Sequence, residues 1–173
     1  MLPPDLSNQP ILNIDLLRSD VEALRNKGKT IVLTNGCFDL VHAGHVSSLS
    51  FAKSLGNVLI VALNSDASIK RLKGPGRPIL SAEYRARMVA ALKPVDYVLI
   101  FETDTAIEIV QSLKPDFYVK SADYNINETP EGKAVLEYGG KVRTSPMLNG
   151  VSTSQIIERI LLGYRDKMEE WRV

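Results

Sequence analysis

The sequence predicts an α/β fold in which one doubly wound parallel sheet carries helices on both faces. Short runs rich in valine, isoleucine and leucine alternate with longer segments whose apolar residues recur at helical spacing. The chain has 173 residues, 45% hydrophobic and 24% charged, which is enough for one compact core. We therefore expect a single domain over residues 13–173, preceded by an irregular, proline-containing arm over residues 1–12.

The predicted strands are short, mostly apolar runs, as expected for strands that are buried on both faces of a sheet. A helical segment separates each strand from the next, so the strands should be parallel and the sheet Rossmann-like. In chain order the predicted strands span residues 30–34, 58–64, 95–101, 116–120 and 141–144.

The predicted helices have apolar residues three and four positions apart and end at recognisable signals. Ser81 can cap a helix start, and Gly28, Gly56 and Gly139 follow predicted helix ends, where glycine is favoured. In chain order the predicted helices span residues 15–27, 45–55, 82–92, 105–113, 131–138 and 153–170.

The overall composition excludes several classes of protein. The chain has 21 basic and 20 acidic residues, a net charge of +1, so it lacks the basic surface of a protein that binds nucleic acid or an anionic membrane. Its apolar runs are too short to span a bilayer, and we see no signal peptide, so we expect a cytoplasmic protein. Cys37 is the only cysteine, and we interpret it as a small core or loop residue rather than a nucleophile.

Four polar or glycine-containing segments follow predicted strands. In a parallel sheet the carboxyl ends of the strands meet at one edge, and ligands bind there. The sequence therefore predicts a binding site built from residues 35–45, 64–66, 120–124 and 150–154.

The first of these segments contains the only two histidines, His42 and His45, with Gly44 between them. Glycine lets the backbone approach a ligand closely, and a helix start offers free N–H groups and a positive dipole end. Histidine can also stabilise charge that develops on phosphorus. We interpret the pair as phosphate-binding; a structural role is the alternative, and zinc is disfavoured because too few further ligands exist.

Ser152, Thr153 and Ser154 follow Gly150 at the start of the last predicted helix. One hydroxyl suffices to cap a helix, so capping alone accounts for one of the three. Hydroxyls at a helix N-terminus can also bind the distal phosphates of a nucleotide. With the histidine segment, the triplet predicts a site for a triphosphate.

These motifs resemble those of the nucleotidylyltransferase superfamily, which has a His-x-Gly-His motif after its first strand and a Ser/Thr triplet that opens a late helix. The chain is most similar to the adenylyltransferase domain of bacterial ADP-heptose synthase, over about residues 12 to 162. The matching segments are residues 34–39, 42–47, 64–68, 70–74 and 77–78.

The resemblance implies transfer of AMP from ATP to a sugar 1-phosphate, D-glycero-β-D-manno-heptose 1-phosphate. The products would be pyrophosphate and ADP-heptose for lipopolysaccharide core assembly. Mg²⁺ would bridge phosphate oxygens of ATP and need no metal site made by the protein. The implied catalytic residues are His42, His45, Lys53 and Arg85; the implied nucleotide-binding residues are Asn35, Gly36, Phe38, Asp39, Gly44, Asp123, Ser152, Thr153 and Ser154; and the implied substrate-binding residues are Asp66 and Lys73.

The chain departs from the ADP-heptose pattern where those enzymes read Val-Lys-Gly-Gly-Asp-Tyr, because Ser121 and Ala122 replace the two glycines. A cytidylyltransferase that acts on glycerol 3-phosphate or another phosphorylated alcohol is therefore an alternative. A non-catalytic nucleotide-binding module is an alternative of another class. Many relatives carry a heptose kinase domain that this sequence lacks, so we expect a stand-alone form or an excised domain. A homodimer is a family expectation.

Overall fold

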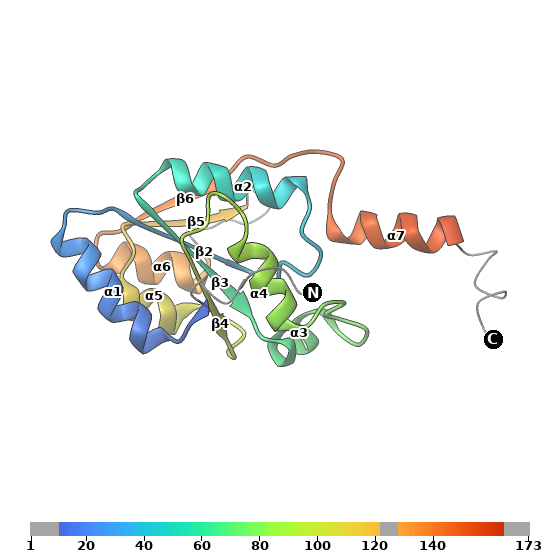
Figure 1. Cartoon of the computed structure of the whole chain (residues 1–173), viewed down its shortest axis with the longest axis horizontal. Coiled ribbons are helices and arrows are strands. Elements are labelled where there is room, and N and C mark those ends of the chain that lie inside the picture. The colour runs from blue at the N-terminus through green and yellow to red at the C-terminus, as the bar shows by residue number, and fades with distance from the viewer. Residues whose placement is uncertain (1–10, 122–127, 165–173) are drawn as a thin grey trace, which may run out of the picture.

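The structure is a computed structural model that describes residues 11–121 and 128–164. Its centre is one six-stranded sheet in the order β1-β4-β3-β2-β5-β6, in which every pair of neighbours is parallel. This confirms the predicted α/β class (Figure 1). The strands are β1 (Ile11–Leu12), β2 (Ile31–Gly36), β3 (Val58–Asn64), β4 (Tyr97–Phe101), β5 (Phe117–Ser121) and β6 (Lys141–Ser145).

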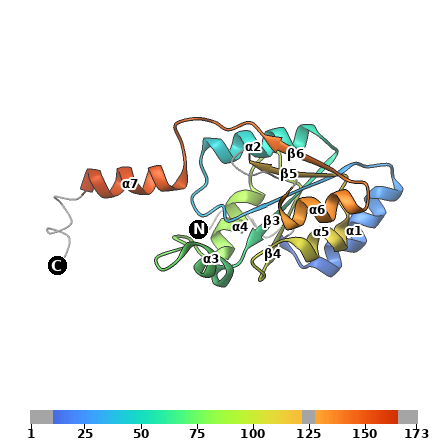
Figure 2. The ribbon, with the colours of Figure 1, turned by 180° about the vertical axis from the view of Figure 1, so that it is seen from behind.

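Helices cover both faces of the sheet, as predicted (Figure 2). On one face the core contains residues of α1, α5 and α6 together with alternate strand residues such as Leu33. On the other face it contains residues of α2 and α4 together with the intervening strand residues, such as Val32. The helices are α1 (Ile14–Asn26), α2 (Ala43–Ser54), α3 (Asp66–Lys73), α4 (Ala82–Ala90), α5 (Ile107–Leu113), α6 (Pro130–Glu137) and α7 (Thr153–Tyr164).

Two predictions about local structure are wrong. Residues 11–12 belong to strand β1, which pairs with Val98 and Leu99 of β4, rather than to an irregular arm. Two residues are too few for a periodic pattern, so only their neighbour in the sheet reveals them as a strand. Helix α3, which contains Lys73, is missing from the predicted helices; Ser65 caps this helix by accepting a hydrogen bond from Ser68 N–H, at 3.2 Å. The eight-residue helix is too polar for its apolar spacing to be recognised.

The last helix differs from the others because it projects away from the sheet (Figure 1). None of its residues is buried, and Ile160, Leu161 and Leu162 are more than half exposed. Within the described ranges 11–121 and 128–164, none of the helices combines the length and apolar character needed to cross a bilayer.

The order of the strands indicates where along the sheet a ligand is expected to bind. From β2 the sheet continues through β3 and β4 in one direction, and β5 and β6 lie on the other side. The order therefore reverses between β2 and β5, and ligands of such sheets bind beyond the carboxyl ends of the strands at this point.

Candidate active site

The loop after β2 and the segment before α7 meet beyond the carboxyl end of the sheet. A Cβ atom added to Gly44 would lie 3.6 Å from Val151 Cγ1, and the Thr153 hydroxyl lies 3.5 Å from the Leu40 carbonyl oxygen, to which it donates. The hydroxyls of Ser48 and Ser145, 2.7 Å apart, also tie α2 to the end of β6. The two segments are distant in the sequence, and the structure brings them together.

The two histidines form one unit at the start of α2. His42 is the N-cap, and the imidazole of His45 stacks on that of His42 with ring centroids 3.8 Å apart and an interplanar angle of 24°. His42 N–H donates to Nδ1 of His45 at 3.3 Å. Because Nδ1 accepts this bond, a neutral His45 carries its proton on Nε2 and can donate from there.

Small and aromatic neighbours fix the position of the histidine pair. A Cβ atom on Gly44 would lie 3.0 Å from both Cε1 and Nδ1 of His42, so a larger residue would displace that ring. Phe38 lies on the other side, with its ring centroid 5.0 Å from that of His45. Nδ1 of His42 is buried and has no hydrogen-bond partner within the described part of the chain. A buried polar atom without a partner is costly, so a ligand that satisfies it would stabilise the site.

Burial keeps both histidines neutral in the free protein. It lowers the pKa of His42 below its ordinary value of 6.5. Burial and the neighbouring His42 lower the pKa of His45 to about 4. At neutral pH the pair therefore acts as hydrogen-bond donors and acceptors and not as a fixed positive charge.

The lowered pKa of His45 predicts a pH-dependent stability. Unfolded protein protonates this histidine near pH 6.5 and folded protein near pH 4, so the unfolded state binds more protons between these values. The stability due to neutral His45 is therefore complete above about pH 6.5 and is lost as the pH falls towards 4. Urea unfolding at pH 7.0 and 4.5 should show a larger loss in the wild type than in His45→Gln. Equal losses in the two proteins would contradict the assigned pKa.

The hydroxyl triplet at the start of α7 divides into different roles. The Ser152 hydroxyl accepts from Gln155 N–H at 3.2 Å, which is the ordinary capping contact. Ser154 is exposed and lines a cavity of about 380 Å³. Capping therefore accounts for one hydroxyl, and the exposed Ser154 is free to meet a ligand.

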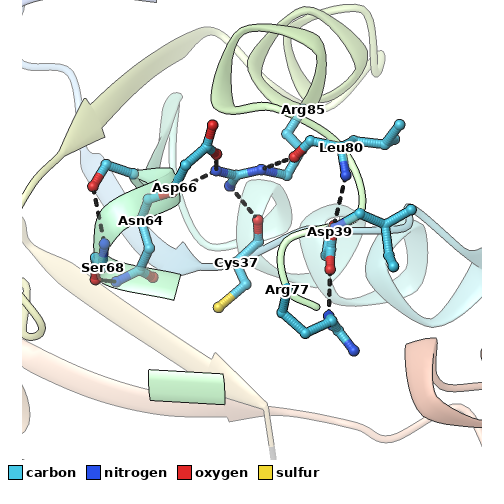
Figure 3. Close-up of polar contacts among 10 residues, drawn as sticks. Cys37, Asp39, Asn64, Asp66, Ser68, Arg77, Leu80 and Arg85 are labelled. Carbon is cyan, nitrogen blue, oxygen red and sulfur yellow. Dashed lines mark hydrogen bonds and ion pairs between the residues drawn. The ribbon is translucent and has the colours of Figure 1, made fainter. Parts of the chain in front are cut away.

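Asp39 is buried, and its carboxylate is hydrogen-bonded to other residues of the chain. Its carboxylate accepts from Ile79 N–H and Leu80 N–H, at 2.7 and 3.1 Å, and from Arg77 Nε (Figure 3). All these donors belong to the segment between α3 and α4. In this structure the Asp39 carboxylate therefore orders that segment. It does not face a nucleotide, which is the role that the resemblance implies.

Arg85 is also hydrogen-bonded to its own chain and is not placed to contact a ligand, which is the role that the resemblance implies. Its side chain is fully buried, and its guanidinium donates to the carbonyl oxygens of Cys37, Asn64 and Leu80 at 2.7 to 3.0 Å and to the carboxylate of Asp66 at 2.7 Å (Figure 3). A group with no exposed surface cannot contact a ligand in this conformation. The sequence identifies Arg85 as a cation near the site but cannot show that backbone carbonyls surround it.

Several other predicted residues lie at the edge, and most of them are in contact with neighbouring side chains. The Asn35 side chain accepts from the Tyr118 hydroxyl at 2.6 Å. Phe38 is buried, and a Cβ atom on Gly36 would lie 3.0 Å from its ring. Asp66 is partly exposed beside Arg85. The structure thus places Asn35 and Phe38 under the site and leaves Asp66 partly exposed at its edge, while Asp123 lies outside the described residues.

Lys53 is on the wrong side of the molecule for catalysis. It lies in the last turn of α2, about 16 Å along the helix axis from His42. Its ammonium group donates to Asn57 O at 2.6 Å and to the Asp96 carboxylate. These partners precede β3 and β4, at the amino end of the sheet. The sequence places Lys53 on the correct helix, but the direction of that helix carries it away from the site.

Replacement of Lys53 by methionine should therefore leave the turnover of the enzyme within about twofold of wild type. The loss of a partly exposed ion pair should lower the free energy of unfolding by about 1 kcal/mol or less. Steady-state kinetics and urea unfolding test both expectations. A turnover reduced by an order of magnitude in folded protein would restore a catalytic role.

Several cations surround Cys37 at the carboxyl end of β2. Burial raises the pKa of the Cys37 thiol, while Lys73, Arg85, Lys120 and Arg77 act in the opposite direction. The raised pKa argues against a nucleophilic thiolate. Lys73 is exposed, as a ligand-binding lysine must be. Arg77 received no role from the sequence; the glycines and prolines around it indicate only a loop.

The donors at this edge fit phosphate and not a metal ion held by the protein. Imidazoles, hydroxyls and backbone N–H groups are hydrogen-bond donors to anions, whereas Mg²⁺ requires oxygen ligands such as carboxylates. Over residues 11–121 and 128–164, no group of three or more His, Cys, Asp or Glu side chains could hold a metal ion.

Known proteins share both the sequence and the fold. The bifunctional protein HldE of Syntrophotalea carbinolica is 52% identical over 149 residues, 86% of this chain and 30% of its own length. HldE of Trichlorobacter lovleyi is 48% identical over 165 residues, 93% of this chain and 33% of its own length. The chain thus spans about a third of the curated relatives that it matches.

A lipopolysaccharide core biosynthesis protein from Thermoplasma volcanium superposes with a TM-score of 0.58 and 27% identity, over 70% of this chain and 98% of that one. Pantoate-β-alanine ligase from Francisella tularensis has the same fold, with a TM-score of 0.55 and 16% identity over 88% of this chain and 76% of the ligase. The family model described as cytidylyltransferase-like matches residues 33–159, which include most of β2, both histidines and the hydroxyl triplet. The chain therefore belongs to the cytidylyltransferase-like family.

Proposed function

We propose that the chain transfers AMP from ATP to a sugar 1-phosphate, D-glycero-β-D-manno-heptose 1-phosphate, with release of pyrophosphate and formation of ADP-heptose. The observation that carries the proposal is the stacked histidine pair at the start of α2, which meets the hydroxyl segment that opens α7. Two helix N-termini with side-chain donors face one edge of the sheet, an arrangement suited to a triphosphate.

The choice of acceptor is supported by the relatives. The bifunctional proteins HldE of seven bacteria match most of this chain at 43–52% identity. The chain also resembles the adenylyltransferase domain of ADP-heptose synthase at residues 64–68, 70–74 and 77–78. We place the reaction in the cytoplasm, where ATP is available.

In the proposed reaction a phosphate oxygen of the sugar 1-phosphate attacks the α-phosphorus of ATP. A new P–O bond forms, and the bond from the α-phosphorus to the bridging oxygen breaks as pyrophosphate leaves. His45 donates from Nε2 to oxygens that gain negative charge, and His42 lies beside it at the helix start. The Ser154 hydroxyl and the backbone N–H of Thr153 at the helix start hold the β and γ phosphates, and Lys73 attracts the phosphate of the acceptor. Bound magnesium would neutralise charge on the triphosphate.

A matrix of ATP, CTP, GTP and UTP against heptose 1-phosphate and glycerol 3-phosphate tests the proposal. Pyrophosphate release should require ATP together with heptose 1-phosphate. Strict dependence on CTP would overturn ADP-heptose synthesis and support a cytidylyltransferase. The absence of turnover for every pair, with retained nucleotide binding, would indicate a non-catalytic module.

A further inference from the structure

Arg77 is a half-buried cation in the segment between α3 and α4. Its side chain is 20% exposed, and its Nε donates to the fully buried carboxylate of Asp39 (Figure 3). An arginine has five N–H donors, so this contact uses one and leaves the four on the two Nη atoms. Within the described residues, no residue besides Asp39 accepts a hydrogen bond from this guanidinium.

The free part of Arg77 faces the start of α7. Arg77 and Ser154 line the same cavity of about 380 Å³, together with Glu158 and three apolar residues of α7, Ile157, Leu161 and Leu162. An arginine can only donate hydrogen bonds, and the start of a helix also presents donors and a positive dipole end. Among the lining residues Arg77 and Ser154 therefore offer donors to an anion with several oxygen acceptors, and phosphate matches the fork of a guanidinium.

The segment that carries Arg77 is held from two sides. Asp39 accepts from Leu80 N–H, and Arg85 donates to Leu80 O at 3.0 Å. Both anchoring side chains are buried. Because Asp39 also binds Nε of Arg77, the same carboxylate fixes the backbone of the segment and the direction of the guanidinium. Arg77 is thus preorganised and loses little side-chain freedom when an anion binds.

We propose that Arg77 binds the terminal phosphates of the nucleotide opposite Ser154, and that Asp39 is a positioning residue that aims the Arg77 guanidinium. The inference deepens the proposed function, because it depends on Ser154 lying beside the triphosphate. One carboxylate, Glu158, also lines the cavity, but it forms no ion pair with Arg77 and lies one helical turn after Ser154. A Glu158-bound Arg77 is the competing arrangement that the experiment must exclude.

Isothermal titration calorimetry of the whole chain with Mg²⁺ tests the inference without an acceptor. The titrants are ATP, AMP and inorganic tripolyphosphate, and the variants are Arg77→Gln, Arg77→Lys, Asp39→Asn and the double variant Asp39→Asn/Arg77→Gln. Arg77→Gln should weaken ATP and tripolyphosphate at least about tenfold, as expected when a charge-assisted hydrogen bond is lost. AMP affinity should stay within about twofold, because AMP lacks the distal phosphates.

Asp39→Asn should weaken the same two ligands, and the double variant should bind no more weakly than Arg77→Gln alone if Asp39 acts through Arg77. The matched control is Arg87→Gln, since Arg87 is exposed on α4 and pairs with Glu83. If Arg77→Gln does not fold, Arg77→Lys decides, because it keeps a cation beside Asp39 but lacks the fork. Circular dichroism confirms which variants fold.

Three results would overturn the inference: wild-type protein that binds neither ATP nor tripolyphosphate, equal weakening of AMP and ATP, or a Glu158→Gln variant that loses as much tripolyphosphate affinity as Arg77→Gln. The last would show that Arg77 serves to hold α7. A failure of the proposed function has a different signature, because triphosphate binding would depend on Arg77 while heptose 1-phosphate would not turn over.

Discussion

Replacing His45 by alanine should lower kcat at least about 100-fold while the protein stays folded. The imidazole of His45 lies at the helix start, and its Nδ1 is occupied by His42 N–H, which leaves Nε2–H as the donor to a developing charge. Alanine removes this donor and leaves the helix backbone in place. Steady-state assays of pyrophosphate release measure kcat and KM separately.

Because a donor that acts mainly in the transition state lowers kcat more than it raises KM, the KM for ATP should change much less than kcat. Arg87→Gln is the control, since Arg87 lies exposed on α4 and pairs with Glu83. An unchanged kcat in His45→Ala would remove this histidine from the chemical step.

Replacing Arg85 by methionine should lower the free energy of unfolding by about 3–5 kcal/mol. Methionine fills much of the space but leaves the carbonyl oxygens of Cys37, Asn64 and Leu80 without their donor. Buried acceptors that lose their partners cost far more than exposed ones. Urea unfolding of both proteins, monitored by circular dichroism, measures the loss.

Asp66→Asn is the matched comparison, because it removes the charge that pairs with Arg85 but keeps an oxygen acceptor. The Asp66 side chain is 44% exposed and the three carbonyl oxygens keep Arg85 as their donor, so Asp66→Asn should lower the free energy of unfolding by less than Arg85→Met does. A stable Arg85→Met protein that no longer binds ATP would show instead that Arg85 contacts the nucleotide, as the sequence motif implied.

The parallel sheet could be predicted because its signal is local and repeated. The strand at Val58–Asn64 matches its predicted range, and every one of its residues is buried, as a run of apolar residues between covering helices must be. Strand β1 and helix α3 escaped prediction for the opposite reason, since a two-residue strand and a short polar helix are stabilised by neighbours in space.

The sequence by itself determined the fold class, the histidine pair at a helix start and the hydroxyl triplet at another, because each is encoded within a few adjacent residues. Only the tertiary structure decided which cations face the ligand edge. Arg85 is buried under it, Lys53 lies at the opposite end of α2, and Arg77 lines the cavity with Ser154. The physical reason is that the direction of a helix and the carbonyls around a side chain depend on contacts between distant segments, which adjacent residues do not encode.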